Sequence, residues 1–185
     1  SSLTGFAMDN MTRDDGWRFL SIGRRLERLS FLANAIGNFL RMPSARGPGS
    51  LEWLLELADS IITYRSRYSR LPELLPVIDL LVFDDSNPHG VVFQGSVLAR
   101  YLDRMGRELG DHSESSLPDV LSRLRAFSLE PLEHLQFNEC RTCPPCEELA
   151  DLLKELDAAA VQLSARLGMR YFTHVGDVSR QTMAL

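Results

Sequence analysis

The fold is decided by a stretch near the start of the chain, residues 17–40, which reads WRFLSIGRRLERLSFLANAIGNFL. Its apolar side chains recur every three or four residues, and this spacing places them on one face of a helix. The members of this face are Phe19, Ile22, Leu26, Leu29, Ala33, Ile36 and Leu40. Thr12 and Asp15 form a capping box in front of the stretch, and Pro43 follows it. The pattern predicts a long amphipathic helix between these two signals.

The rest of the chain repeats this organisation in shorter segments. Further helices are predicted at 50–68, 88–109, 118–127 and 147–167. A short apolar segment, Val77 to Phe83, fits a buried helix or a buried strand, and the surrounding helices favour a helix because a lone strand has no partner. We therefore expect an all-α bundle of about six mostly antiparallel helices, with residues 1–185 forming one domain.

The composition is that of a globular protein, with 44% hydrophobic and 24% charged residues in 185. The net charge of -5 argues against binding to nucleic acid, because neutralising phosphates needs a positive field. The longest apolar stretch, 77–83, is too short to cross a membrane and contains Asp79. Residues 1–10 lack the pattern of a secretory signal, and three cysteines cannot all pair within the chain. We expect a cytoplasmic protein with no membrane and no nucleic-acid partner.

Several charged side chains stand at positions where the helical pattern predicts burial. The first helix has a second line of largely apolar positions, which indicates that it is covered on both sides. The members of this line are Trp17, Leu20, Arg24, Glu27 and Phe31, with Arg28 beside them. Arg65 continues an apolar line in the second helix, and Asp79 is the sole charge in 77–83. We expect these groups to converge, together with Gln94, at one sheltered place between the helices.

Two interpretations of this polar centre remain open. It is either a structural network of interhelical ion pairs, or a cleft whose arginines bind a carboxylate or phosphate through bidentate hydrogen bonds. The charges are unequal, because four arginines face two acids. The arginines are Arg24, Arg28, Arg65 and Arg67, and the acids are Glu27 and Asp79. If these four arginines meet only these two acids, the site has an excess of positive charge and can accept an anion.

Four motifs, which occur in order along the chain, resemble the bacterial alpha-E domain, a predicted helical family named for its Glu-Arg motif. They are residues 11–20 (MTRDDGWRFL) with 23–28 (GRRLER), residues 64–68 (YRSRY), Asp79 with residues 84–88 (DDSNP) and 93–94 (FQ), and residues 171–174 (YFTH). The resemblance runs from near residue 8 to near residue 175, and it adds Asp84, Asn87 and His174 to the candidate binding residues. His89 stands where the family pattern usually has Arg.

The resemblance also implies a functional context. Alpha-E domains are associated with circularly permuted ATP-grasp enzymes and with transglutaminase-like proteases, in systems that make or modify peptides. The matching residues contain neither a Ser/His/Asp or Cys/His set nor a Gly-rich phosphate loop. This favours a non-catalytic accessory module that binds an anionic peptide group. The alternative is an enzyme subunit that contributes acid–base residues to amide ligation.

The family members are longer than this chain, so the resemblance implies that the chain is the C-terminal part of the domain and lacks N-terminal helices. An apolar face left open by their absence predicts a homodimer.

Three cysteines, Cys140, Cys143 and Cys146, lie within seven residues, and His134 precedes them. Three thiolates and an imidazole could complete a tetrahedral zinc site, which would make the chain a zinc-binding protein. Cys143 and Cys146 also enclose two prolines at a predicted helix start, where the helix dipole lowers a thiol pKa, so a redox pair is a second interpretation. The third is a surface loop that only happens to hold cysteines.

Overall fold

A computed structural model describes residues 13–42, 48–109, 115–133 and 143–184 of the chain. Within these ranges every regular element is helical and none is a strand, which confirms the predicted all-α fold class. The elements are α2 (Arg13–Arg41), α3 (Pro48–Leu57), α4 (Ile61–Arg67), α5 (Leu74–Ile78), the π-helix η2 (Asp79–Phe83), α6 (Val91–Leu109), α7 (Leu117–Ala126), α8 (Glu130–Glu133) and α9 (Pro144–Met183). The six helices predicted from the sequence are therefore an approximation.

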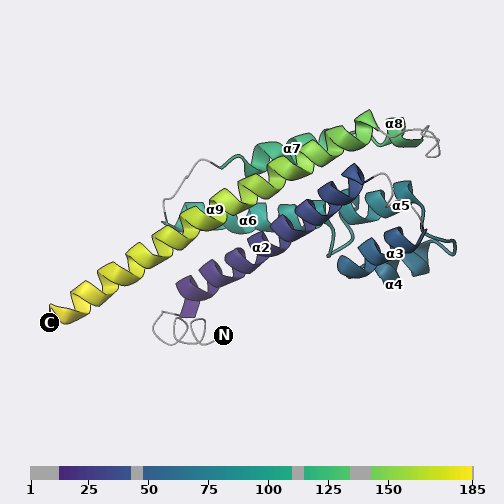
Figure 1. Cartoon of the computed structure of the whole chain (residues 1–185). Coiled ribbons are helices and arrows are strands. Elements are labelled where there is room, and N and C mark those ends of the chain that lie inside the picture. Colours follow the sequence, from purple (N-terminus) through teal and green to yellow (C-terminus); the bar gives the residue numbers. More distant parts are fainter. Residues whose placement is uncertain (1–12, 43–47, 110–114, 134–142, 185) are drawn as a thin grey trace.

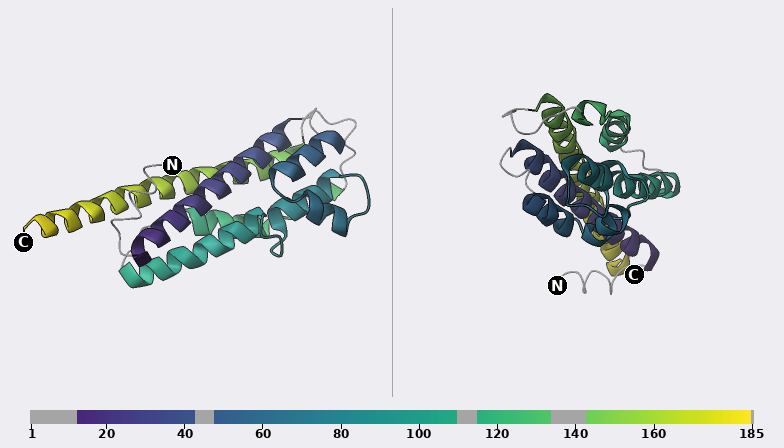
Figure 2. Two further views of the ribbon diagram at one scale, coloured as in Figure 1. Left: turned by 90° about the horizontal axis from the view of Figure 1, so that it is seen from below. Right: turned by 90° about the vertical axis from the view of Figure 1, so that its right-hand side faces the viewer.

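The two longest helices, α2 and α9, lie side by side and run antiparallel (Figures 1 and 2). The predicted apolar face of α2 is buried, with Leu29 and Ile36 both at 0% exposure, and on α9 Leu153 and Leu156 are equally buried. Polar side chains seal the edge of the contact, where Asn34 donates to Asp157 at 3.2 Å. The C-terminal part of α9 extends past the start of α2 (Figure 1).

The shorter helices pack around part of this pair and leave the outer face of α2 exposed. Helix α6 packs against α2, α7 packs against α9, and α3, α4 and α5 gather around the C-terminal end of α2 (Figure 1). Helices α6 and α7 pack closely at Gly95, which faces the side chain of Leu121. None of the helices in the described ranges is long and apolar enough to span a membrane.

The structure corrects the prediction of one continuous helix over 50–68. The helix breaks between Leu57 and Ile61, because Asp59 adopts a left-handed backbone conformation with φ of 50°. The hydroxyl of the next residue, Ser60, is buried and donates to the carbonyl of Ala58 at 2.9 Å. A short polar side chain tolerates this conformation better than most residues do. The break ends α3 and starts α4 in a new direction.

Other boundaries also differ from the prediction. Residues 77–83 are helical, which settles the choice between helix and strand, but their second half is a π-helix. Helix α6 starts at Val91 rather than Pro88, and α9 starts at Pro144 and runs well beyond Leu167. The predicted capping box includes Thr12, which lies outside the described residues.

A glycine substitution at Gly95 tests the packing of α6 on α7, and one at Gly37, where α2 meets α9, is its control. In Gly95→Ala the new Cβ would overlap the δ-methyl groups of buried Leu121, so we expect unfolding free energy to fall by roughly 1–3 kcal/mol. In Gly37→Ala the new Cβ would lie 3.6 Å from Leu153 Cβ, an ordinary contact, so the gain in helix propensity of up to about 1 kcal/mol should remain. Urea unfolding followed by circular dichroism measures both values. Equal stabilisation by the two substitutions would contradict the described packing.

Candidate functional site

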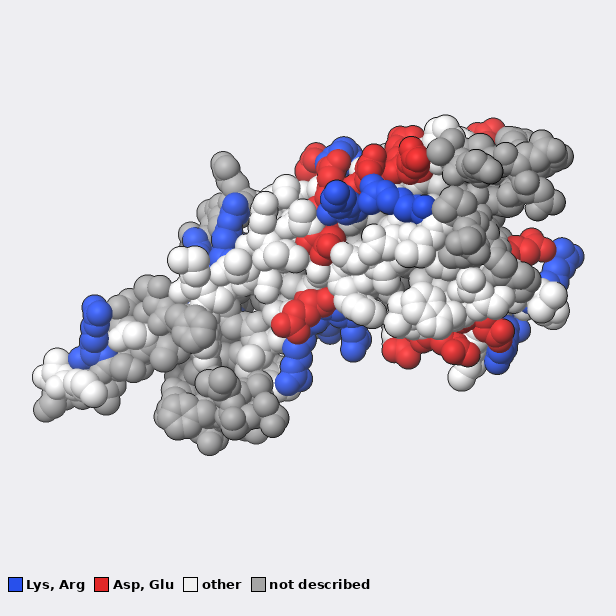
Figure 3. Space-filling view, in the orientation of Figure 1, with Lys and Arg blue, Asp and Glu red and all other residues white. Residues whose placement is uncertain are grey.

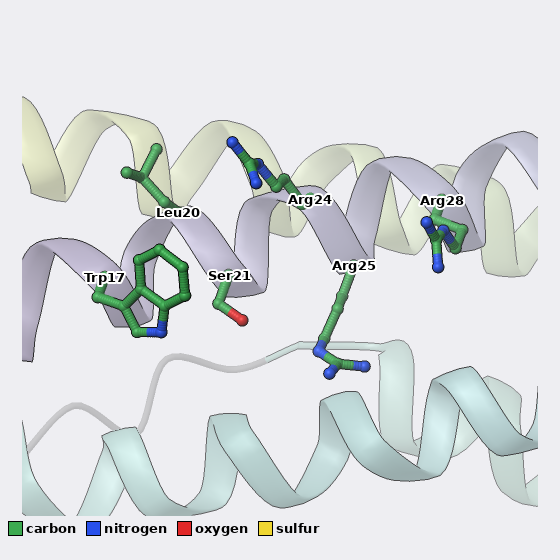
Figure 4. A pocket seen from close by; sticks show the side chains of 6 residues that line it. All are labelled: Trp17, Leu20, Ser21, Arg24, Arg25 and Arg28. Carbon is green, nitrogen blue, oxygen red and sulfur yellow. The ribbon is translucent and has the colours of Figure 1, made fainter. Parts of the chain in front are cut away.

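Three arginines on the outer side of α2 line a hollow of about 210 Å³ (Figure 4). The full lining is Trp17, Leu20, Ser21, Arg24, Arg25 and Arg28. Their position follows from the helical repeat, since burying one face of α2 against α9 turns residues 17, 24 and 28 away from the core. Figure 4 shows all six side chains on α2, and of its three arginines only Arg25 extends toward α6.

The arginines of this hollow differ in how they are held. The Arg25 guanidinium lies over the ring of Tyr101 on α6, with its Cζ atom 5.1 Å from the ring centroid, which is a cation–π contact. Arg24 and Arg28 are exposed, and within the described residues neither forms an ion pair or hydrogen bond. Glu27 is exposed on the same helix and is unpaired in that part of the chain too. The hollow thus presents more positive than negative charge.

Elsewhere on the surface, several arginines have acidic partners. Over α7 and α9, acidic and basic side chains lie next to one another (Figure 3). Arg123 bonds to the carboxylates of both Asp119 and Glu155, and Arg41 of α2 pairs with Asp151. Such exposed pairs contribute little to stability. They nevertheless leave few donors for a ligand, whereas Arg24 and Arg28 keep theirs available.

The prediction of one shared polar centre is wrong. Arg24, Glu27 and Arg28 point to solvent, because α2 is covered on one side only within the described residues, and Trp17 and Phe31 of the second line are 59% and 55% exposed. Arg65 does not join them.

Arg65 is exposed and pairs with Glu52 of α3, because the helix break at Asp59 interrupts the apolar line that the sequence pattern extended to it. The predicted binding roles of these residues are a separate matter and remain hypotheses.

A second group of predicted residues does come together, between α4 and η2. Arg67 pairs with the carboxylate of Asp84 and donates to the hydroxyl of Ser86 at 3.0 Å. Asp84 also accepts hydrogen bonds from the Ser86 amide at 2.8 Å and the Ser86 hydroxyl at 2.6 Å. Burial alone would raise the pKa of Asp84, but the bonds from Ser86 and the charge and bond of Arg67 outweigh it and lower this pKa.

Asp79 lies at the start of the π-helix and shares the same arginine. Burial raises its pKa, the nearby negative charge of Asp84 raises it further, and Arg67 offsets these two effects only in part. Two acids therefore share one guanidinium, and it is Asp84 that forms the ion pair with it. Because two acids stand against one arginine, the group has no excess positive charge with which to bind an anion.

Asn87 and Gln94 are buried and bind backbone next to this group. The amide of Asn87 donates to the carbonyl of Leu80 at 3.0 Å and to the hydroxyl of Ser60 at 3.2 Å. A π-helix shifts its hydrogen bonds by one residue, and Asn87 supplies a donor to a carbonyl within it. Gln94 donates to the carbonyl of Pro88, and its own Oε1 has no partner within the described residues. The predicted residues Asn87 and Gln94 thus connect the π-helix to the start of α6.

The remaining candidates fall partly outside the described residues. His134 and Cys140 lie there, and the side chain of His174 is not described although its backbone belongs to α9. Cys143 and Cys146 are buried free thiols, and Cys143 caps α9 by accepting a bond from the Cys146 amide at 3.4 Å. The described ranges hold no group of three or more His, Cys, Asp or Glu suited to a metal ion. The zinc and redox interpretations remain open, whereas the surface-loop interpretation is wrong for Cys143 and Cys146, which are buried at the start of α9.

Sequence reasoning did not choose Arg25 or Trp17 as site residues. Arg25 follows Arg24 and falls between the buried and exposed faces of α2, so only its contact with Tyr101 reveals where it points. The sequence pattern puts Trp17 on the second line of the helix and predicts that other helices cover this line, whereas Trp17 is 59% exposed. The sequence does contain a pattern that indicates a shared helix face. Residues four apart lie next to each other on a helix, and the lining includes two such series, Trp17, Ser21 and Arg25 and also Arg24 and Arg28.

Comparison with known proteins identifies the family. A model named Alpha-E, described as a predicted alpha-helical domain with a conserved ER motif, matches residues 1–172. The chain is also similar to uncharacterized proteins of Mycobacterium bovis and of two strains of Mycobacterium tuberculosis. Each is 31% identical over 162 residues, which cover 85% of this chain and 18% of the relative. No solved structure matches the chain. The chain belongs to the Alpha-E family and spans 18% of the length of these curated relatives.

Replacing each of the two acids beside Arg67 should change the stability of the protein in opposite directions. Asp84→Asn removes charge-assisted bonds, so we expect unfolding free energy at pH 7 to fall by about 1–3 kcal/mol. Asp79→Asn removes a charge disfavoured by burial, so it should raise the melting temperature slightly at the same pH.

The pH dependence of these two effects follows from the direction of each pKa shift. Stabilisation by Asp84 is present above the usual value of 3.8 and is lost as the pH falls through its lowered pKa. The penalty from Asp79 is present above its raised pKa and absent below 3.8, so the gain in Asp79→Asn should vanish in acid. Thermal melts from neutral to acidic pH measure both. A loss of stability at pH 7 in both variants would contradict the assignment.

Proposed function

We propose that this Alpha-E domain is a non-catalytic helical binding module whose arginine hollow on α2 binds an anionic group of a peptide. The observation that carries the proposal is the pair Arg24 and Arg28, which are exposed and have no acidic partner within the described residues. An arginine fork matches the planar geometry of a carboxylate and can donate two parallel hydrogen bonds to it.

The lining of the hollow favours a carboxylate that is attached to an apolar stem. Trp17 and Leu20 add apolar surface beside the guanidinium groups, and Tyr101 holds Arg25 in place from the neighbouring helix. An inorganic anion would bind the arginines but would make no apolar contact with Trp17 and Leu20. A peptide carboxylate, from a side chain or a C-terminus, uses both.

We further propose that the domain works in the bacterial cytoplasm beside a circularly permuted ATP-grasp amide ligase, in a system that makes or modifies peptides. The family context described above supports this step, as does the chemistry, because an amide ligase joins a carboxylate to an amine. A module that holds a carboxylate-bearing peptide would deliver substrate to such an enzyme. A transglutaminase-like protease is the second expected partner in the same system.

The test uses Trp17 as a reporter, because it lines the hollow. In a Trp53→Phe background, Trp17 is the remaining tryptophan, and its fluorescence is titrated with the capped peptide N-acetyl-triglutamate. We expect saturable binding that weakens with added salt. Arg24→Gln combined with Arg28→Gln should lower the affinity at least about tenfold, which corresponds to roughly 1.4 kcal/mol.

A matched control removes the same charge from another helix. Arg100 and Arg104 are also exposed and four residues apart, and they lie on α6 outside the hollow. Their double substitution by Gln should leave the affinity for triglutamate within about twofold of the parent, since long-range charge effects are screened. Equal weakening in both double variants, with circular dichroism unchanged, would mean diffuse attraction and would refute a specific site.

A further inference from the structure

We infer that the outer face of α2 is a docking surface for an acidic amphipathic helix of a partner protein. The inference rests on the proposed function, since it takes the anionic group bound by Arg24 and Arg28 to be side chains of that helix. It adds a second contact, an apolar hollow at the other end of α2. The partner is thus recognised by acids at one end and by a large apolar side chain at the other.

Exposed apolar side chains mark this face along α2 and just after its last residue, Arg41. Trp17, Phe31 and Met42 are 59%, 55% and 55% exposed. They are separated by fourteen and eleven residues, which are close to whole numbers of helical turns, so all three belong to one side. Arg24 and Arg28 fall on the same side between them. Large apolar residues repeated along one exposed face are typical of an interaction surface.

The apolar hollow lies where this face meets α3 and has a volume of about 410 Å³. Its lining comprises Ala35, Asn38, Phe39, Met42, Gly49, Ser50 and Trp53. Trp53 is 57% exposed, so its ring forms an open wall of the hollow rather than part of the core. The volume is within the range that holds small apolar ligands, and it is ample for one phenylalanine or leucine side chain.

The two hollows are spaced so that one helix can reach both. Fourteen residues separate Arg28 from Met42, and at a rise of 1.5 Å per residue this is about 21 Å along α2. A second helix packed at a shallow angle stays in contact over several turns. Its acids would lie opposite Arg24 and Arg28, and its apolar anchor would lie about fourteen residues away, against Trp53.

The charge on the face favours an acidic partner over a second copy of this chain. Two unpaired arginines, Arg24 and Arg28, stand against the single acid Glu27. A twofold contact between two α2 helices would bring together four of these arginines and two such acids, which leaves positive charge unmatched. A partner helix with several carboxylates can neutralise Arg24 and Arg28 by itself, without any contribution from Glu27.

The probe is a fluorescein-labelled synthetic helix of about 20 residues, with two glutamates one turn apart and a phenylalanine about fourteen residues beyond them on the same face. Fluorescence anisotropy measures its affinity for the full chain. Replacing the glutamates by glutamine, or the phenylalanine by alanine, should each weaken binding at least about tenfold. No binding of the parent helix, or equal binding of all three helices, would overturn the inference.

Variants of the chain separate this inference from the proposed function. Trp53→Ala should weaken binding of the synthetic helix about tenfold and leave the affinity for N-acetyl-triglutamate unchanged. Ile62→Ala is the control, because Ile62 is 80% exposed and lies on α4 outside the hollow. It should leave both affinities unchanged. If Trp53→Ala and Ile62→Ala behave alike while triglutamate still binds, the docking surface is refuted and the anion site stands.

Two other outcomes are equally decisive. If triglutamate itself does not bind, the proposed function fails and the docking surface fails with it. Sedimentation velocity tests the second-copy alternative. A dimer of the chain that dissociates when Arg24 and Arg28 are replaced by glutamine would assign the face to self-association and would overturn the inference.

Discussion

The burial of one face of α2 against α9 determines which side chains of α2 are exposed on its outer face. A helix repeats every 3.6 residues, so fixing Leu29 and Ile36 in the core also fixes which residues point away from it. Arg24 and Arg28 are on the outer side for this reason alone. The core and the candidate site are therefore two faces of one helix, and a shift of register in the α2–α9 contact would change both together.

The charged motif residues divide into two groups according to whether their charges are matched. Between α4 and η2, Arg67 and Asp84 neutralise each other, while buried Asn87 binds the backbone of the π-helix. These interactions position segments of the chain. On α2, Arg24 and Arg28 lack acidic partners within the described part, which is why the proposed function rests on these two arginines. The charge balance of each group, rather than its membership in a motif, distinguishes the structural role of the first group from the binding role proposed for the second.

The sequence predicted the parts of the fold that depend on a long local pattern. The buried face of α2 and its end before Pro43 follow from helical spacing over many residues, and the all-α class follows from several such segments. The break at Asp59 was not predicted, because one residue with φ of 50° leaves the apolar spacing intact. The π-helix was not predicted either, since its shifted hydrogen bonds carry no sequence period.

The site was harder to predict than the fold, because it depends on which faces are left uncovered. Trp17 and Phe31 were expected under a second layer, and they are exposed instead. The spacing of side chains along a helix cannot say how many neighbours that helix has. For the same reason the pairing of Arg65 with Glu52, and the contact of Arg25 with Tyr101, required the arrangement of the helices in space.

The contact between Arg25 and Tyr101 has a thermodynamic consequence for whatever enters the hollow. Ordering a free arginine side chain costs up to about 1.5–2 kcal/mol in rotamer entropy. Arg25 has already lost part of this freedom in the unliganded protein because it is stacked on a neighbouring helix, whereas Arg24 and Arg28 retain it. For an anion that binds Arg25, the hydrogen-bond donor is therefore already partly ordered. Each further guanidinium that it recruits carries an entropic penalty, so a contact with Arg24 or Arg28 requires more ordering than a contact with Arg25.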